Sequence, residues 1–210
     1  MSYRAWFLSS IRAVLAAGHP VTRRRNRRSG FGVEQLERRA LLAAFSSSAQ
    51  TVTLDLNVDA QIVQVASTGS TYTFTLSGGA TNTWSGTAGS GLSASGAVLT
   101  ADATALSNFS LFKITDSAAN TTANFSGSGA NAFNDSFEVT LDSLSTAVRF
   151  SGNSSFSGSN NLTIVTDSRV ELPSGSCLTM ANGNLDMNIN MQASPQVLNF
   201  SGLMVNGATI

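Results

Sequence analysis

Three aspartates are the residues of this chain whose types and spacing could do chemistry. Asp116, Asp142 and Asp167 each precede a serine, and they recur at nearly equal steps along the chain. If one step corresponds to one structural repeat, Asp142 and Asp167 lie in neighbouring repeats, about 5 Å apart. Two carboxylates at such a distance could bind calcium or act as the paired acids of a retaining glycosidase. Asp142 and Asp167 are therefore the candidate metal ligands.

The same three residues also fit a purely structural role. Asp-Ser after a strand is a common turn, in which the side chains hydrogen-bond to the backbone. The chain lacks the Gly-Gly-x-Gly-x-Asp calcium repeat, and the basic residues Lys113, Arg149 and Arg169 do not share the phase of the aspartates. We favour the turn interpretation and predict no catalytic residue, no bound metal and no cofactor.

Other residue types narrow the chemistry further. The only histidine is His19, close to the N-terminus, so the rest of the chain cannot build a Ser-His-Asp triad, a Cys-His pair or a multi-histidine metal site. The single cysteine, Cys177, cannot form an internal disulfide. Trp84, surrounded by Thr, Ser and Gly, is the candidate for an exposed sugar-stacking ring, whereas Tyr72 alternates with apolar residues and is expected in a core.

Charge divides the chain into two parts despite a formal net charge of zero. Residues 1–44 contain nine basic residues against two acidic ones, a net charge of +7, and the remainder contains three basic residues against ten acidic ones, a net charge of −7. The acidic remainder would repel nucleic acid and anionic lipid. The apolar stretch near Trp6 is interrupted by Arg12 and is too short for a transmembrane helix.

The basic segment carries a recognisable motif. An arginine-rich run at 23–28 is followed by Leu36-Glu37-Arg38-Arg39-Ala40-Leu41-Leu42, which resembles the LEPRxLL-type N-terminal sorting motif of planctomycete extracellular proteins. Leu36, Glu37, Arg39, Leu41 and Leu42 match that motif, and Arg38 replaces its usual proline. The resemblance implies export through the cell's export machinery, and attachment to the cell surface or release from it. The segment itself is expected to be partly helical or disordered.

The elements that would position the aspartates are strands. Val52, Leu54 and Leu56 alternate with polar residues, as do Tyr72 and Phe74, and clusters of Gly and Ser separate such runs. A constant step relates Phe125-Ser126-Gly127 to the same triplet at 150–152 and, two steps later, at 200–202. Apolar columns keep that step: Phe112, Phe137, Leu162 and Met187; and Ile114, Val139, Ile164 and Ile189.

These columns predict an all-β parallel β-solenoid (β-helix) with coils of about 25 residues, because stacked coils place equivalent residues in ladders. We divide the chain into an export and sorting segment (1–44), N-terminal strands that form a cap or irregular coils (45–99), and solenoid coils that end incomplete (100–210). A second set of residues, Thr122, Ala147, Leu172 and Val197, follows the step more loosely. The alternative is an antiparallel sandwich, whose strands recur at much shorter intervals.

Together these features favour an exported cell-surface or extracellular protein with a structural or adhesive role and no enzymatic activity, resembling the repeat regions of adhesins. Its polar faces would bind glycans or other envelope proteins. Two alternatives remain open: the non-catalytic N-terminal part of a carbohydrate-active β-helix enzyme, and a fragment of a larger surface protein that folds poorly alone.

Overall fold

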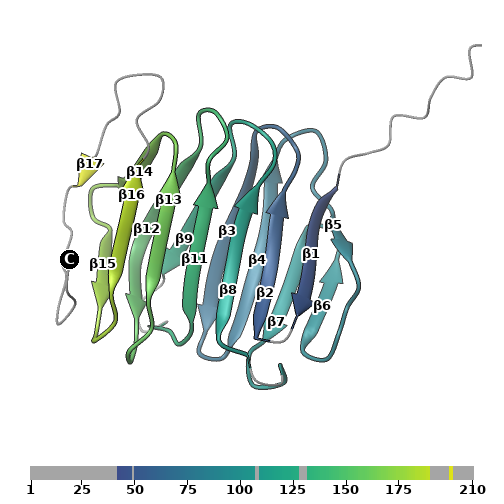
Figure 1. Ribbon diagram of the computed structural model, residues 1–210, viewed down its shortest axis with the longest axis horizontal. Coiled ribbons are helices and arrows are strands. Elements are labelled where there is room, and N and C mark those ends of the chain that lie inside the picture. The colour runs from purple at the N-terminus through teal and green to yellow at the C-terminus, as the bar shows by residue number, and fades with distance from the viewer. Residues whose placement is uncertain (1–41, 49, 107–108, 128–131, 190–198, 201–210) are drawn as a thin grey trace, which may run out of the picture. The chain divides into compact units, whose positions relative to one another are not determined.

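The computed structural model describes residues 42–48, 50–106, 109–127, 132–189 and 199–200. Every regular element in these ranges is a β-strand (Figure 1). The all-β class is thus observed, and it follows from alternating apolar residues, as in β2 (Thr51–Leu56), where Val52, Leu54 and Leu56 are buried and the residues between them are half-buried. Most of the sorting motif and most of the basic segment lie outside the described residues.

A seven-stranded sheet forms one layer of the molecule. Its strands, from one edge to the other, are β16 (Leu185–Ile189), β13 (Leu162–Thr166), β11 (Ser136–Leu141), β8 (Leu111–Asp116), β2, β1 (Ala43–Ser48) and β5 (Trp84–Gly86). The strands pair in parallel from β16 to β2, whereas β1 and β2 are antiparallel. The sheet is therefore mixed.

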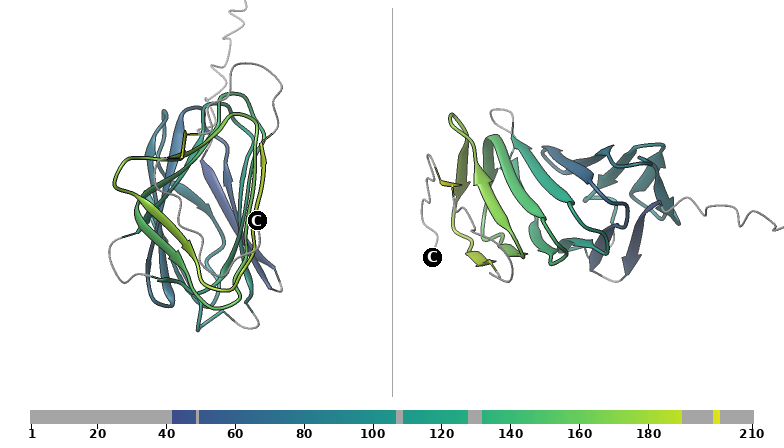
Figure 2. Two further views of the ribbon diagram at one scale, coloured as in Figure 1. Left: turned by 90° about the vertical axis from the view of Figure 1, so that its left-hand side faces the viewer. Right: turned by 90° about the horizontal axis from the view of Figure 1, so that it is seen from above.

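A ten-stranded sheet forms the opposite layer. Its main path runs through β17 (Asn199–Phe200), β14 (Arg169–Leu172), β12 (Ala147–Phe156), β9 (Thr122–Gly127), β3 (Gln61–Thr68), β4 (Thr71–Gly78), β7 (Val98–Asp102) and β6 (Leu92–Ser95). Two short strands, β10 (Ala132–Phe133) and β15 (Cys177–Met180), pair with β12 beside this path. Figure 2 shows the two sheets facing each other.

The predicted parallel β-solenoid is wrong. Both sheets are mixed and open, and antiparallel pairs join β1 to β2, β3 to β4, β4 to β7 and β6 to β7. The described residues form two facing mixed sheets, an arrangement closer to a β-sandwich than to a β-helix. Two tight hairpins account for much of the difference: Gly69-Ser70 joins β3 to β4, and Gly96-Ala97 joins β6 to β7. Both glycines have positive φ, 83° and 54°, which lets the chain reverse within a two-residue loop.

The repeat step nevertheless predicts part of the strand register correctly. Phe112 pairs with Phe137 and Phe137 with Leu162, in parallel strands. The last step of that column is wrong, because Leu162 pairs with Leu185 instead of Met187, and Met187 pairs with Ile164. In the second, looser set, the pairing of Thr122 with Ala147 is confirmed. The next pairing is wrong, because Ala147 pairs with Arg169 instead of Leu172.

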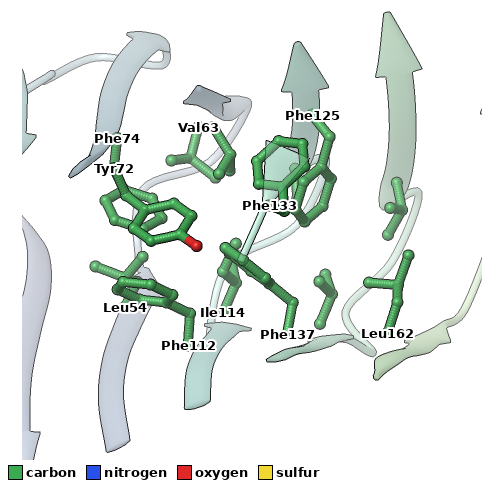
Figure 3. Close-up of a cluster of buried hydrophobic side chains, with 14 of the residues drawn as sticks. Leu54, Val63, Tyr72, Phe74, Phe112, Ile114, Phe125, Phe133, Phe137 and Leu162 are labelled. Atoms are coloured by element: carbon green, nitrogen blue, oxygen red, sulfur yellow. The ribbon is translucent and has the colours of Figure 1, made fainter. Parts of the chain in front are cut away.

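Aromatic rings from both sheets fill the space between the layers (Figure 3). Phe112 on β8 lies with its ring centroid 4.6 Å from that of Tyr72 on β4 and 5.1 Å from that of Phe137 on β11. Phe125 on β9 stacks on Phe150 with centroids 5.2 Å apart. The contact of Phe112 with Tyr72 joins the two sheets, whereas the other two contacts join neighbouring strands of one sheet. Burial of these rings stabilises the packing of the layers and leaves the outer faces to the polar residues of each strand.

Candidate binding face

The three predicted aspartates lie at the carboxyl ends of three neighbouring parallel strands of the seven-stranded sheet, β8, β11 and β13. Leu141 pairs with Thr166, so Asp142 and Asp167 follow paired residues, and the Asp167 N–H donates to the Leu141 carbonyl at 3.1 Å. The carboxylate of Asp116 caps the next turn. It accepts the Asp142 N–H at 3.1 Å and the Thr121 hydroxyl at 2.9 Å.

These hydrogen bonds place Asp116 in a turn-capping role. Burial raises the pKa of Asp116 above its usual value, and hydrogen bonds from Thr121 and from the backbone of Asp142 act in the opposite direction. Among the described residues, no three His, Cys, Asp or Glu side chains are grouped so as to hold a metal ion. The role of Asp142 and Asp167, as turn residues or as metal ligands, stays a prediction.

The aromatic candidates behave differently from each other. Tyr72 is fully buried, as its alternation with apolar residues predicts. Trp84 is only 5% exposed, and its indole N–H donates to the Phe74 carbonyl at 3.0 Å, so the prediction of an exposed sugar-stacking ring is wrong. Its polar sequence neighbours belong to a short edge strand, and the ring itself belongs to the core.

A small open pocket of about 200 Å³ lies where the hairpin of β1 and β2 meets the segment that leads into β8. Its lining is Ser47, Ser48, Thr51, Val52, Ser90, Leu106 and Phe109. None of these lining side chains is charged, so the pocket offers shape and hydroxyl groups without a group for acid or base chemistry.

The outer face of the ten-stranded sheet carries a regular arrangement of small polar residues. A row of small residues, which we call the hydroxyl row, crosses six neighbouring strands from β6 to β12: Ser93, Thr100, Thr73, Ala66, Ser126 and Ser151. Ala66, the one member without a hydroxyl group, and Ser126 follow the paired residues Val65 and Phe125. Each member of the row is exposed or half-buried, whereas the immediate neighbours Leu99, Phe74, Val65, Phe125 and Phe150 point into the core.

A second row, the amide row, runs beside the hydroxyl row on the same face. It consists of Thr75, Gln64, Asn124, Arg149 and Glu171, which pair across β4, β3, β9, β12 and β14. Hydrogen bonds join the two rows: the Gln64 amide donates to the Ser126 hydroxyl at 3.1 Å, and the Ser151 hydroxyl donates to the Asn124 carbonyl oxygen at 2.8 Å. The polar groups are thus held in place before any ligand arrives.

The chain matches no protein-family model, no curated protein and no solved structure at a significant level. The rows must therefore be judged by their own geometry. Neighbouring strands lie about 4.8 Å apart, so the hydroxyl row places donors and acceptors at that spacing on β6, β7 and β4 and again on β9 and β12, with Ala66 interrupting it on β3. Such a face can bind a polymer of polar units or the surface of another protein.

The sequence alone did not predict the hydroxyl row or the amide row. It identified polar strand faces, but the partners Thr100 and Thr73 come from antiparallel strands whose pairing the repeat does not predict. The Ser126 and Ser151 pair was within reach, because both belong to the repeated Phe-Ser-Gly triplet. In the described residues, no helix is both long enough and apolar enough to cross a bilayer.

Proposed function

We propose that this chain is an exported cell-surface or extracellular protein with a structural or adhesive role, and that it binds glycans or neighbouring envelope proteins through the outer face of its ten-stranded sheet. The hydroxyl row carries the proposal. Hydroxyl groups both donate and accept hydrogen bonds, as the hydroxyl groups of a polysaccharide do. A row fixed on paired strands loses little conformational entropy when it binds.

The charge pattern supports the same proposal. The net charge of −7 beyond residue 44 opposes binding to nucleic acid and to anionic lipid, whereas glycans and protein surfaces still fit. The resemblance of residues 36–42 to a sorting motif supports export. Cell fractionation of the tagged full chain tests this part, with recovery from the envelope or the medium expected. Retention in the cytoplasm would contradict export.

The binding role is tested by retention of the full chain on insoluble cellulose, on chitin and on washed cell envelope. The variant Thr73→Val/Thr100→Val removes two paired hydroxyl groups and keeps the shape of both side chains. Loss of two hydrogen bonds should weaken retention by about tenfold. The matched control, Thr140→Val/Thr163→Val, removes two half-buried hydroxyl groups from the other sheet and should bind as the unchanged protein does.

Absence of retention on all three materials would overturn the binding role. Equal loss in the control variant would also overturn the assignment to this face, because it would show that the effect does not depend on the hydroxyl row.

A further inference from the structure

Two arginines extend the binding face at the β12 and β14 end. Arg149 on β12 and Arg169 on β14 are about half exposed, with side-chain exposures of 47% and 53%, and both lie on the outer face of the ten-stranded sheet. Glu171 pairs with Arg149 in register and is bonded to both: its carboxylate lies 3.0 Å from Nε of Arg169 and 4.0 Å from Nε of Arg149.

One carboxylate between two guanidinium groups leaves this cluster with a positive charge. Each guanidinium presents five N–H donors, whereas Glu171 alone supplies a single carboxylate. The closer contact goes to Arg169, and the Arg149 contact is at the outer limit of an ion pair. Arg149 is thus the guanidinium with the greater capacity for a second anion. A local positive charge is exceptional here, because residues 45–210 carry a net charge of −7.

A ligand bound to Arg149 would also contact the neighbouring strand β9. Asn124 pairs with Arg149 in register, and its carbonyl oxygen accepts the Ser151 hydroxyl. An anion bound to Arg149 would therefore lie beside the amide row and the hydroxyl row. Arginine binds a planar carboxylate in a bidentate manner, and the neighbouring amide and hydroxyl groups suit the hydroxyl groups of a sugar ring.

We propose that Arg149 and Arg169 select carboxylated sugars, so that the face prefers polysaccharides that contain uronate units over neutral ones. This inference rests on the proposed binding role and specifies its ligand class. Glu171 would hold the two guanidinium groups in position. A polyanion of dense charge would be repelled by the acidic surroundings, whereas a single sugar carboxylate meets mainly this cluster.

The test uses the full chain. Small ligands replace polymers, because the basic segment 1–44 would attract any acidic polymer without specificity. Binding of D-galacturonate, D-galactose and acetate is followed by NMR, through the Nε–H signals of Arg149 and Arg169. We expect galacturonate to shift these signals at concentrations at which galactose and acetate do not. The variant Arg149→Gln/Arg169→Gln should weaken galacturonate binding at least about tenfold, by loss of charge-assisted hydrogen bonds.

The matched control is Lys113→Gln, on the other sheet, where the ammonium is 2.6 Å from the Glu138 carboxylate. It should bind galacturonate as the unchanged protein does. Equal shifts with acetate would overturn recognition of a sugar, and unchanged binding by the arginine variant would overturn the assignment to this pair. Retention on cellulose that persists while galacturonate fails to bind would refute this inference and leave the proposed binding role intact.

Discussion

The hydroxyl group of Tyr72 donates a hydrogen bond of 2.6 Å to the Asp135 carboxylate and accepts the Asn134 N–H at 2.9 Å. The tyrosine ring is fully buried and packs against Phe112, Phe133 and Phe137 (Figure 3). Strand β4 is thereby tied to the turn before β11, although the two lie far apart in the sequence.

Tyr72→Phe should destabilise the fold by about 1–3 kcal/mol, because the Asn134 N–H and the Asp135 carboxylate lose a partner while the ring is retained. Urea unfolding followed by circular dichroism measures the change. Asp135→Asn keeps an acceptor for the Tyr72 hydroxyl and should cost less. An unchanged midpoint for Tyr72→Phe would show that water replaces the hydroxyl at no cost.

The same contact predicts a loss of stability in alkali. Burial, followed by the hydrogen bond to Asp135, raises the pKa of Tyr72 far above its ordinary value of 10. The folded state therefore favours the neutral phenol, whose contribution is complete below pH 10 and is lost as the pH rises above it. The free energy of unfolding should fall more steeply above pH 10 in the unchanged protein than in Tyr72→Phe.

Phe112 should be one of the most sensitive positions of the core. Its ring lies 4.6 Å from Tyr72 on the opposite sheet and 4.4 Å from Phe109. Phe112→Ala should cost about 3–5 kcal/mol, because it opens a cavity between the sheets. Phe109 is half-buried, so Phe109→Ala should cost clearly less in the same urea experiment. Equal costs would contradict the position of Phe112 at the centre of the cluster.

Neighbouring residues of β13 should respond in opposite ways to one added charge. Ile164 is fully buried, and Ile164→Asp should prevent folding because it places an unpaired carboxylate between the sheets. Val165 is half-buried on the outer face, so Val165→Asp should leave a cooperative unfolding transition. Circular dichroism during heating distinguishes the two. A folded Ile164→Asp protein would refute the inward direction of this residue.

Asp116 and Asp142 should differ, although both begin an Asp-Ser turn. Asp116→Ala removes the acceptor of the Thr121 hydroxyl and of the Asp142 N–H, at a cost of about 1–3 kcal/mol. Asp142 is exposed, and Asp142→Ala should change stability by no more than about 0.5 kcal/mol. A larger effect of Asp142→Ala, seen only when calcium is present, would instead support the metal interpretation.

The titration of Asp116 offers a further check. Because burial raises its pKa above 3.8, the folded state favours the protonated acid. That contribution is complete below about pH 3.9 and is lost as the pH rises through the raised pKa. Carbon NMR of the Asp116 carboxyl group should give a midpoint above 3.8, and a midpoint at or below this value would contradict the burial of the carboxylate.

Local sequence predicts the strands and the direction of their side chains well. Alternation identifies Val52, Leu54, Tyr72 and Phe74 as core residues, and all four are buried. The reason is that a strand turns successive side chains to opposite faces, so the pattern of one strand is sufficient. The repeat step also pairs Phe112 with Phe137, because equal spacing in the chain brings equal positions of parallel strands together.

The arrangement of the strands is less accessible to such reasoning. The repeat predicts coils only, whereas the Gly69-Ser70 and Gly96-Ala97 loops impose antiparallel hairpins. These two-residue loops begin with glycine, which is a local hairpin signal that the search for repeats does not detect. The strand beside β8 is β2, and Val52 pairs with Phe112 although 60 residues separate them, a distance that the repeat step does not predict.

The sequence by itself determined the all-β class of the described residues, a charge boundary near residue 44, a part of the core and a part of the parallel register. Only the tertiary structure decided that the strands form two mixed sheets, that Trp84 is buried and that Thr73 meets Thr100 while Arg149 meets Glu171. The physical reason is that alternation is a property of each strand alone. The order of strands in a sheet depends on loop geometry and on packing between residues that are distant in the sequence, and the binding face exists only once that order is established.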